Sequence, residues 1–296
     1  MPSPVNFILK QRIMRLRAAV PIAATVAQFG RRLPPLWPAH CLVCREPCAT
    51  QADAPDLAAA TDITGLCSAC RIDLPWNRSA CARCALPMPV PTAACGRCLR
   101  RPPPLFETRA AFAYGPPLDR LLPRLKFHDD LAAGRLLAAL MAAEFTRMRE
   151  CATDTDVDSA AASAIVNAAS SRPDALIPLP LHRSRLRSRG YDQALELARP
   201  LAKRFDIPLR VDVLQRDRNT SPQSRLNAAA RRKNLRGAFA VNIDAITSAA
   251  RSTPALAHVV LIDDVMTTGA TLHAAADALL RAGIARVDAW VCARVP

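Results

Sequence analysis

The chain has 296 residues, enough for one large domain or two modest ones, and 51% of them are hydrophobic, so a sizeable core is expected. Only 4% of the residues are aromatic, which favours an α/β protein over an all-β one. Lys and Arg number 40 against 25 Asp and Glu, a formal net charge of +15 that suits phosphorylated metabolites, nucleic acid or an acidic membrane surface. No apolar run is long enough to span a membrane as a helix.

The first predicted stretch, residues 1–37, is a basic leader that is expected to be partly disordered. It carries six basic residues and no acidic one, and its one weak apolar stretch, residues 18–27, is interrupted by Pro21. An export signal that is later removed is the alternative interpretation of this stretch. The cysteine pairs that follow argue against export, because they are typical of a metal site in a reducing compartment.

Residues 38–104 form a cysteine-rich module. Eight of the eleven cysteines lie there in four C-x-x-C pairs, which are Cys41/Cys44, Cys67/Cys70, Cys81/Cys84 and Cys95/Cys98. Such pairs are the usual ligands of a tetrahedral zinc ion, and the simplest pairing gives each ion two successive pairs. The module is therefore predicted to be a double zinc ribbon that holds two structural Zn²⁺ ions, and a cytoplasmic location is expected.

Three alternatives remain for the cysteines. A redox function of the C-x-x-C pairs is one, although redox motifs usually occur once, at the start of a helix. Cys48 could replace Cys44 as a ligand, and His40 could compete for the same position. Cys151 and Cys292 are interpreted as buried or idle thiols.

Residues 105–296 are expected to form an α/β domain, interrupted by a polar, flexible insertion at residues 152–174. Strands are predicted at residues 108–114, 175–179, 209–214, 238–241, 258–262 and 286–293. Helices are predicted at residues 118–127, 131–149, 192–205, 224–235 and 271–282. This alternation predicts a mostly parallel sheet flanked by helices.

The segment at residues 259–271, VVLIDDVMTTGAT, combines a buried strand, two acids, a small polar loop and the start of a helix. Free backbone N–H groups and the positive end of the helix dipole make such a loop a phosphate site. The acids Asp263 and Asp264 fit a ligand that also carries vicinal hydroxyls, or they can position Mg²⁺. A ribose 5-phosphate therefore matches the whole segment. The chain contains no G-x-G and no G-K-[ST], which excludes the dinucleotide fingerprint and the Walker A loop.

Residues 259–271 resemble the phosphoribosyl pyrophosphate motif of type I phosphoribosyltransferases. Two basic stretches are similar to other loops of such enzymes. Residues 183–190, with four arginines in seven positions, follow a predicted strand and resemble a pyrophosphate loop. Residues 215–236, with seven basic residues and one acid, resemble a mobile hood over the active site. The alternatives are a solvated basic loop for the first stretch and a nucleic-acid patch or a charged helix for the second.

These segments in this order resemble the ComF family, the relatives of competence protein F. The likeness includes residues 125–128 (LKFH), 189–193 (RGYDQ), 223–226 (QSRL) and 231–234 (RRKN), and it covers about residues 38–296. It implies a type I phosphoribosyltransferase-like domain behind a zinc-ribbon module. The residues that it assigns to phosphoribosyl pyrophosphate are Asp263, Asp264, Thr267, Thr268, Gly269, Ala270, Thr271, His182, Arg183, Arg189, Gly190 and Lys126. Of these, Asp263, Asp264 and Arg189 are expected to act in catalysis.

The resemblance implies that the chain binds magnesium phosphoribosyl pyrophosphate and transfers phosphoribosyl to an unknown nitrogen acceptor. One departure matters: Thr267 stands where enzymes acting on 6-oxopurines carry a carboxylate base, so that activity is disfavoured. The alternative is a DNA-uptake or competence factor that binds single-stranded DNA, or proteins of the competence machinery, and senses a nucleotide. A metabolite-sensing regulator or scaffold is a third reading. The sequence does not determine the acceptor or the oligomeric state.

Overall fold

The computed structural model describes residues 40–48, 65–127, 130–153, 172–217, 237–246 and 256–296. The chain divides into two compact units, Met1–Ala39 and His40–Pro296, and the first, which contains the predicted basic leader, lies outside the described residues. Most of the predicted insertion and most of the predicted hood lie outside them as well. The predicted domain boundaries therefore stay predictions.

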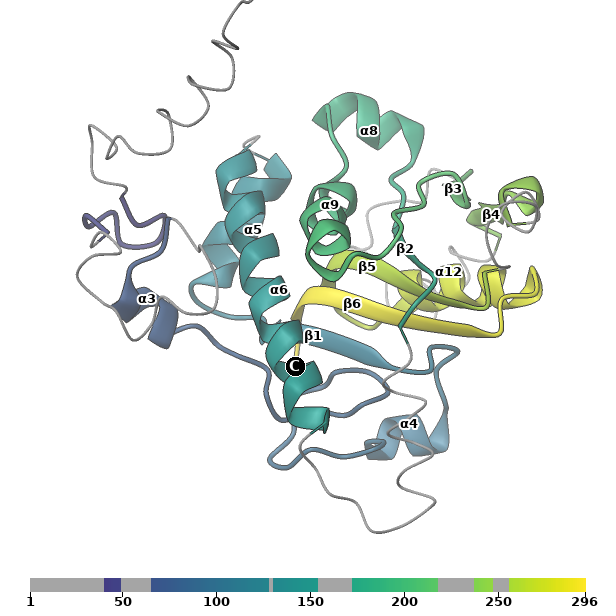
Figure 1. Ribbon diagram of the computed structural model, residues 1–296, viewed down its shortest axis with the longest axis horizontal. Helices are drawn as coiled ribbons and strands as arrows, with labels where there is room; N and C mark the ends of the chain where they lie inside the picture. Colours follow the sequence, from purple (N-terminus) through teal and green to yellow (C-terminus); the bar gives the residue numbers. More distant parts are fainter. Residues whose placement is uncertain (1–39, 49–64, 128–129, 154–171, 218–236, 247–255) are drawn as a thin grey trace, which may run out of the picture. The chain divides into compact units, whose positions relative to one another are not determined.

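Four parallel strands form the main sheet, in the order β1-β6-β5-β2 (Figure 1). The strands are β1 (Thr108–Ala113), β2 (Ala175–Pro178), β5 (His258–Met266) and β6 (Arg286–Arg294). The two long strands, β5 and β6, are central and almost wholly buried, as a continuous apolar run in a parallel sheet requires. The predicted fold class, a mostly parallel sheet flanked by helices, is confirmed.

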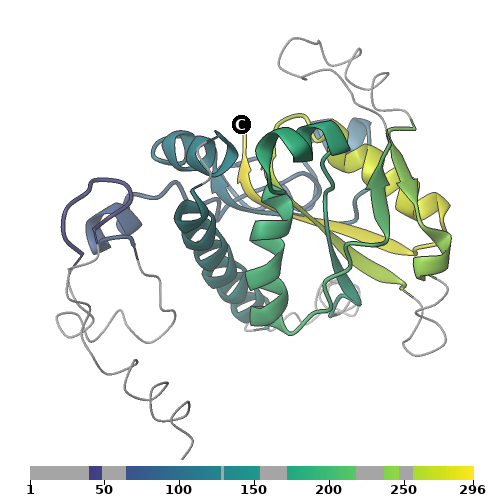
Figure 2. The same ribbon diagram turned by 90° about the horizontal axis from the view of Figure 1, so that it is seen from above.

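Alternate residues of these strands contribute to two separate hydrophobic clusters, one on each face of the sheet. Val260 and Ile262 of β5 pack with α5 (Leu118–Phe127), α6 (Leu131–Thr153) and α9 (Gln193–Phe205). Val259 and Leu261 pack with α12 (Ala270–Arg281) on the other face. Figure 2 shows α6 and α9 running alongside each other over the sheet. The period of two along the strands is the physical reason for this division.

The cysteine-rich module contains two short helices, α3 (Ser68–Ile72) and α4 (Gly96–Arg100). Each follows directly on the first cysteine of a C-x-x-C pair, Cys67 or Cys95, which is the N-cap residue. The helix turn brings the second cysteine of the pair next to the first. In these two pairs the local helix turn alone brings both metal-ligand cysteines together.

Three local predictions differ from the structure. The strand predicted at residues 209–214 is instead β3 (Leu214–Arg216), which pairs antiparallel with β4 (Phe239–Val241). The alternation that suggested the earlier strand does not bury one face, because Val211 is 57% exposed. The strand predicted to end at residue 262 continues to Met266, since its later residues still pair with β6. The arginine run predicted as a loop is a helix, α8 (Arg183–Arg189).

No helix among the described residues is long and apolar enough to cross a membrane.

Candidate functional site

Two adjacent carboxylates lie near the carboxyl end of β5, where ligands of parallel α/β sheets bind. Asp263 and Asp264 are the sixth and seventh residues of that strand. Oδ1 of Asp263 accepts a hydrogen bond of 2.8 Å from the backbone N–H of Asp264, and Oδ1 of Asp264 accepts one of 2.6 Å from Val265. These bonds fix both carboxylates beside the backbone of the strand.

The predicted phosphate loop follows at once and leads into α12. Gly269 is the N-cap residue of α12 and has a φ of +78°, a conformation that favours glycine. A Cβ at this position would lie 2.4 Å from Cε of Met266 and 2.9 Å from Nε2 of His273. Oγ1 of Thr268 accepts a 3.4 Å hydrogen bond from Ala270. The backbone conformation therefore favours glycine at this position, and a Cβ would also require the ends of the Met266 and His273 side chains to move.

Lys126, at the end of α5, is in direct contact with the acidic pair. Its Nζ lies 2.8 Å from Oδ2 of Asp264, although α5 and β5 are far apart in the sequence. The carboxylates of Asp264 and Asp263 raise the pKa of Lys126 against the opposing effect of burial, so the ammonium group stays charged. The fold thus brings Lys126, within the LKFH stretch of residues 125–128, into contact with the acidic motif.

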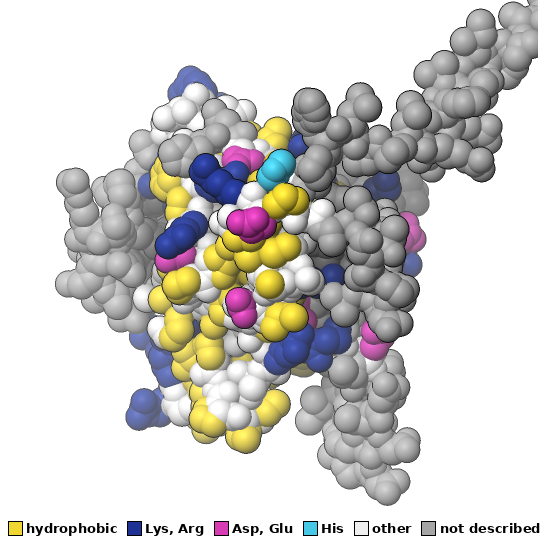
Figure 3. Space-filling view, turned by 90° about the vertical axis from the view of Figure 1, so that its left-hand side faces the viewer, with side chains coloured by type: hydrophobic (Ala, Val, Ile, Leu, Met, Phe, Trp, Pro, Cys, Tyr) yellow, Lys and Arg dark blue, Asp and Glu magenta, His cyan; other side chains and the backbone are white. Residues whose placement is uncertain are grey.

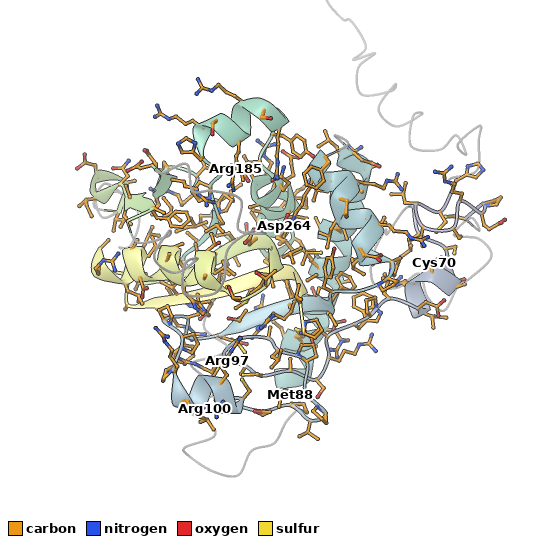
Figure 4. All side chains as sticks on the ribbon, turned by 180° about the vertical axis from the view of Figure 1, so that it is seen from behind. Cys70, Met88, Arg97, Arg100, Arg185 and Asp264 are labelled. Atoms are coloured by element: carbon orange, nitrogen blue, oxygen red, sulfur yellow. The ribbon has the colours of Figure 1, made fainter. Side chains whose placement is uncertain are left out.

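Arginines of α8 lie near the same cluster. The Arg189 guanidinium donates a 2.7 Å hydrogen bond to Oε1 of Gln193 and lies 5.3 Å from the ring centre of Phe127, which is 66% exposed. Burial and the charge of Arg189 together lower the pKa of Arg185, which indicates that the two cations are close. Figure 4 shows Arg185 on α8 and Asp264 on β5 on the same side of the structure, away from Arg97 and Arg100.

Two other predicted residues of this stretch, His182 and Gly190, cap a helix. His182 caps the N-terminus of α8 by accepting a hydrogen bond from the N–H of Ser184 at Nδ1, over 3.2 Å. Gly190, with a φ of +78°, ends the same helix. Arg183, the first residue of α8, is exposed, whereas Arg189, in the last turn, is only partly exposed.

Two further charged residues complete the cluster and were not assigned to the site from the sequence. Burial raises the pKa of Asp192, which also accepts N–H bonds from Leu181 and Leu195 and is repelled by the charge of Asp264. Burial lowers the pKa of Arg216 on β3, an effect increased by Arg185 and opposed by Asp263. Asp192 lies within residues 189–193 and Arg216 within residues 215–236, but only the tertiary fold brings them to the acidic pair.

The most perturbed group of the site is Asp263. Burial, and then the neighbouring charge of Asp264, raise the pKa of Asp263 to about 8, and the charge of Lys126 only partly opposes this. A buried carboxylate beside a like charge resists ionisation unless a cation or hydrogen-bond donors arrive. Ionised Asp263 would therefore be stabilised by an additional cation or hydrogen-bond donor at this position.

The eight paired cysteines form two tetrads, in the predicted pairing. In each tetrad the four Sγ atoms lie within 4.8 Å of one another. Sγ of Cys44 lies 3.7 Å from that of Cys67, and Sγ of Cys84 lies 3.8 Å from that of Cys95. A tetrahedron of sulfurs around zinc at about 2.3 Å has edges of about 3.8 Å, whereas a disulfide bond is about 2 Å long. Both tetrads fit structural zinc sites.

The local environment favours the thiolate at Cys41 of the first tetrad. Burial opposes ionisation of Cys41, but the backbone N–H groups of Cys44, Cys67 and Val43 outweigh it and lower its pKa to about 6. Cys48 lies close enough for its pKa to be raised by the charges of this tetrad, after the larger effect of burial, yet neither Cys48 nor His40 belongs to the four-residue cluster. The alternative ligands considered from the sequence are thus not those that the fold groups together.

Comparison with known proteins agrees with this arrangement. Residues 192–296 match the family model of the phosphoribosyl transferase domain. Competence protein F of Haemophilus influenzae is 31% identical over 181 residues, which are 61% of this chain and 69% of that protein. DNA utilization protein YhgH of Escherichia coli O157:H7 is 30% identical over 230 residues, which are 78% of this chain and 90% of that protein, and the protein of the same name from Salmonella typhimurium is also 30% identical over that length. The chain therefore belongs to the ComF family, the relatives of competence protein F, and it combines a phosphoribosyltransferase domain with two cysteine tetrads that fit structural zinc.

Proposed function

We propose that the chain binds magnesium phosphoribosyl pyrophosphate at the carboxyl end of β5 and transfers its phosphoribosyl group to a nitrogen acceptor. One observation carries the proposal: separate elements bring a compact set of opposite charges to the motif of residues 259–271. The carboxylates are those of Asp192, Asp263 and Asp264, and the cations are those of Lys126, Arg185, Arg189 and Arg216. A ligand with hydroxyls and phosphates uses both kinds of group.

In this proposal the acidic side chains bind the ribose hydroxyls, and the basic and N–H groups bind the phosphates. Asp263 and Asp264 accept hydrogen bonds from the ribose hydroxyls, and the N–H groups and hydroxyls of residues 267–271 hold the 5-phosphate. Arg185 and Arg189 face the pyrophosphate, for which their guanidinium groups are suited. Mg²⁺, when bound, would neutralise pyrophosphate oxygens, and carboxylate oxygens of the acidic pair are the ligands it prefers.

In the proposed reaction the bond between C1 of the ribose and the pyrophosphate oxygen breaks, and the pyrophosphate keeps the electron pair. A bond from the acceptor nitrogen to C1 forms on the opposite face, with inversion, and the nitrogen loses its proton. Thr267 supplies no base at neutral pH, so the proposal favours an acceptor that does not need the carboxylate used on 6-oxopurines.

The first step is tested by calorimetric titration of zinc-loaded protein with magnesium phosphoribosyl pyrophosphate. The wild type is expected to bind, and Asp263→Asn combined with Asp264→Asn is expected to weaken binding by at least about 100-fold, since each charge-assisted bond contributes roughly 1.5–3 kcal/mol. Asp277→Asn is the control, because Asp277 is an exposed acid on α12. No binding by the wild type, or equal binding by the double variant, would refute the proposal. Pyrophosphate release with a panel of nitrogen acceptors then tests transfer.

A second candidate function is binding of single-stranded DNA. The names competence protein F and DNA utilization protein, borne by relatives, motivate it, as does the net charge of +15. The exposed arginines of α4 and its C-cap, Arg97, Arg100 and Arg101, are a candidate contact. The face drawn in Figure 3 is a weaker candidate, because hydrophobic side chains gather across it and basic ones lie mainly at its margin. Binding that does not depend on salt, or is absent, would refute this function.

A further inference from the structure

One buried charge has no role in the site described above. Arg294 is the last residue of β6 and is only 2% exposed, the largest of the fully buried side chains. Its guanidinium group cannot lose its proton in a protein. Across the described residues, no carboxylate lies within 4.0 Å of it. A buried cation of this kind is costly unless hydrogen bonds and a counter-charge compensate it.

The hydrogen bonds of Arg294 join two distant parts of the chain. Its Nε donates to the carbonyl of Cys84, over 2.9 Å, and its Nη1 donates to the carbonyl of Met266, over 3.3 Å, and to that of Val295. Cys84 belongs to the second tetrad, whereas Met266 is the last residue of β5, immediately before the phosphate loop. The N–H of Val295 also donates to the Met266 carbonyl, over 3.0 Å. One side chain thus fixes the peptide at the start of the loop to the peptide of a metal ligand.

The second tetrad can supply the missing counter-charge. Four thiolates with one Zn²⁺ carry a formal charge of about −2. All four of its cysteines are buried, in the same hydrophobic cluster as Met266 and Leu272 of the first turn of α12. The metal centre and the guanidinium are therefore two opposite charges in one apolar region, where their attraction is stronger than in water.

The first tetrad offers a contrast within the same chain. The side chain of Arg124 donates a 2.8 Å hydrogen bond from Nη1 to the carbonyl of Leu42, beside Cys41, and thus joins that tetrad to α5. Arg124 also has its own carboxylate partner, Asp130, 2.6 Å away. Arg124 is therefore a suitable control for Arg294, because it binds the first tetrad to α5 and, within the described residues, has no hydrogen bond or ion pair to the phosphate loop.

We infer that Arg294 is a positioning residue that couples the second zinc site to the phosphate loop, so that zinc in that tetrad and a ribose phosphate at residues 267–271 strengthen each other's binding. The inference rests on the proposed function for its ligand. By linkage, the two effects must be equal in binding free energy. The first tetrad is outside this coupling.

The wild-type protein provides the first test. Zinc release to an excess of a chromogenic chelator is followed with and without magnesium phosphoribosyl pyrophosphate. The two release phases are assigned with Cys44→Ser, which removes a ligand of the first tetrad. The ligand is expected to slow release from the second tetrad by about tenfold, within the usual range of allosteric coupling, and to leave the other phase unchanged. Equal release rates from the second tetrad in the presence of bound ligand would overturn the inference.

Variants of Arg294 provide the second test, with Arg124→Met as control. Arg294→Met is expected to release zinc from the second tetrad faster and to bind the ligand more weakly, and Arg294→Lys, which keeps the charge, to recover part of both. Arg124→Met is expected to affect only the first tetrad. If Arg294→Met retains zinc and ligand like the wild type, the inference is overturned.

If Arg294→Met does not fold, the inference is tested instead by zinc release from Arg294→Lys and from the wild type. If the wild type binds neither the pyrophosphate compound nor ribose 5-phosphate, the proposed function fails, whereas a difference in zinc retention between the Arg294 and Arg124 variants would still support the metal half of the inference.

Discussion

At the scale of single residues, Asp263 and Asp264 are two adjacent carboxylates, and the charged form of Asp263 is unfavourable in the folded protein. Asp263 lies in a strand beside a second carboxylate, and the nearby ammonium group of Lys126 forms its ion pair with Asp264. Burial and the charge of Asp264 therefore raise the pKa of Asp263 to about 8. Functional sites commonly hold such strained charges, because the ligand relieves them.

This strain predicts how stability changes with pH. Because the folded-state pKa of Asp263 exceeds the unfolded one, the folded state binds more protons between about pH 4 and pH 8, and stability falls as pH rises through that window. Asp263→Asn removes this loss. Urea unfolding at pH 6 and pH 9 is expected to show a smaller decrease in the variant, by on the order of 1 kcal/mol or more. Asp277→Asn should behave like the wild type, and an equal decrease in all three proteins would contradict the prediction.

Gly269 allows a similarly local test. Gly269→Ala would force a strained φ, so a stability loss of about 1–3 kcal/mol is expected, and its Cβ, 2.4 Å from Cε of Met266, would displace the end of that side chain. Ligand affinity is expected to fall at least about tenfold, since one turn of the phosphate site must shift. Gly283→Ala is the control: its φ is +99°, but a Cβ there meets nothing within 4 Å. It should lose stability and keep affinity. Equal affinity in both variants would show that the loop tolerates the shift.

At the scale of elements, the two zinc ribbons differ in how they join the domain. The second tetrad shares its hydrophobic cluster with β5, β6 and α12. The peptide around it also bonds to the domain: Thr108 N–H donates to the carbonyl of Ala82 over 2.9 Å, and Asn77 N–H donates to the carbonyl of Ala111 over 3.0 Å. In the first tetrad only Cys41 is fully buried, whereas Cys44 is exposed. The second ribbon is thus part of the core of the domain.

This difference predicts unequal costs of losing one ligand. Cys98→Ser is expected to destabilise the whole domain by several kcal/mol, because a structural zinc site supplies roughly 10–16 kcal/mol. Cys44→Ser is expected to disorder the first ribbon and leave most of the domain intact. Urea unfolding of the zinc-loaded variants, followed by far-UV circular dichroism, measures both. A similar loss in the two variants would contradict the distinction between the ribbons.

At the scale of the whole molecule, the positive charge predicts affinity for polyanions, and a test must separate a specific surface from general attraction. If α4 contacts single-stranded DNA, Arg97→Gln with Arg100→Gln should reduce the slope of log affinity against log salt by about 1.4, since each lost phosphate contact contributes about 0.7. Lys203→Gln with Arg204→Gln, two exposed cations on α9, is the charge-matched control. Equal changes in the two pairs, measured by fluorescence anisotropy, would indicate non-specific attraction only.

The sequence by itself determined the features that depend on local order. The spacing of the cysteine pairs predicted both tetrads, because a C-x-x-C turn brings its two sulfurs together in any fold. The run of apolar residues, two acids and a small polar loop predicted the first five residues of β5 and, within one residue, the start of α12. The helix at residues 118–127 has the predicted bounds, since its apolar positions recur with helical period.

Only the tertiary structure decided which distant charges meet. Nothing in the local sequence of Arg216 or Asp192 indicates that they approach Asp263. Arg294 is the last residue of an otherwise largely apolar strand, and its role follows from carbonyls 28 and 210 residues away. Burial and charge interactions depend on three-dimensional distance, and local patterns carry no information about contacts of such separation.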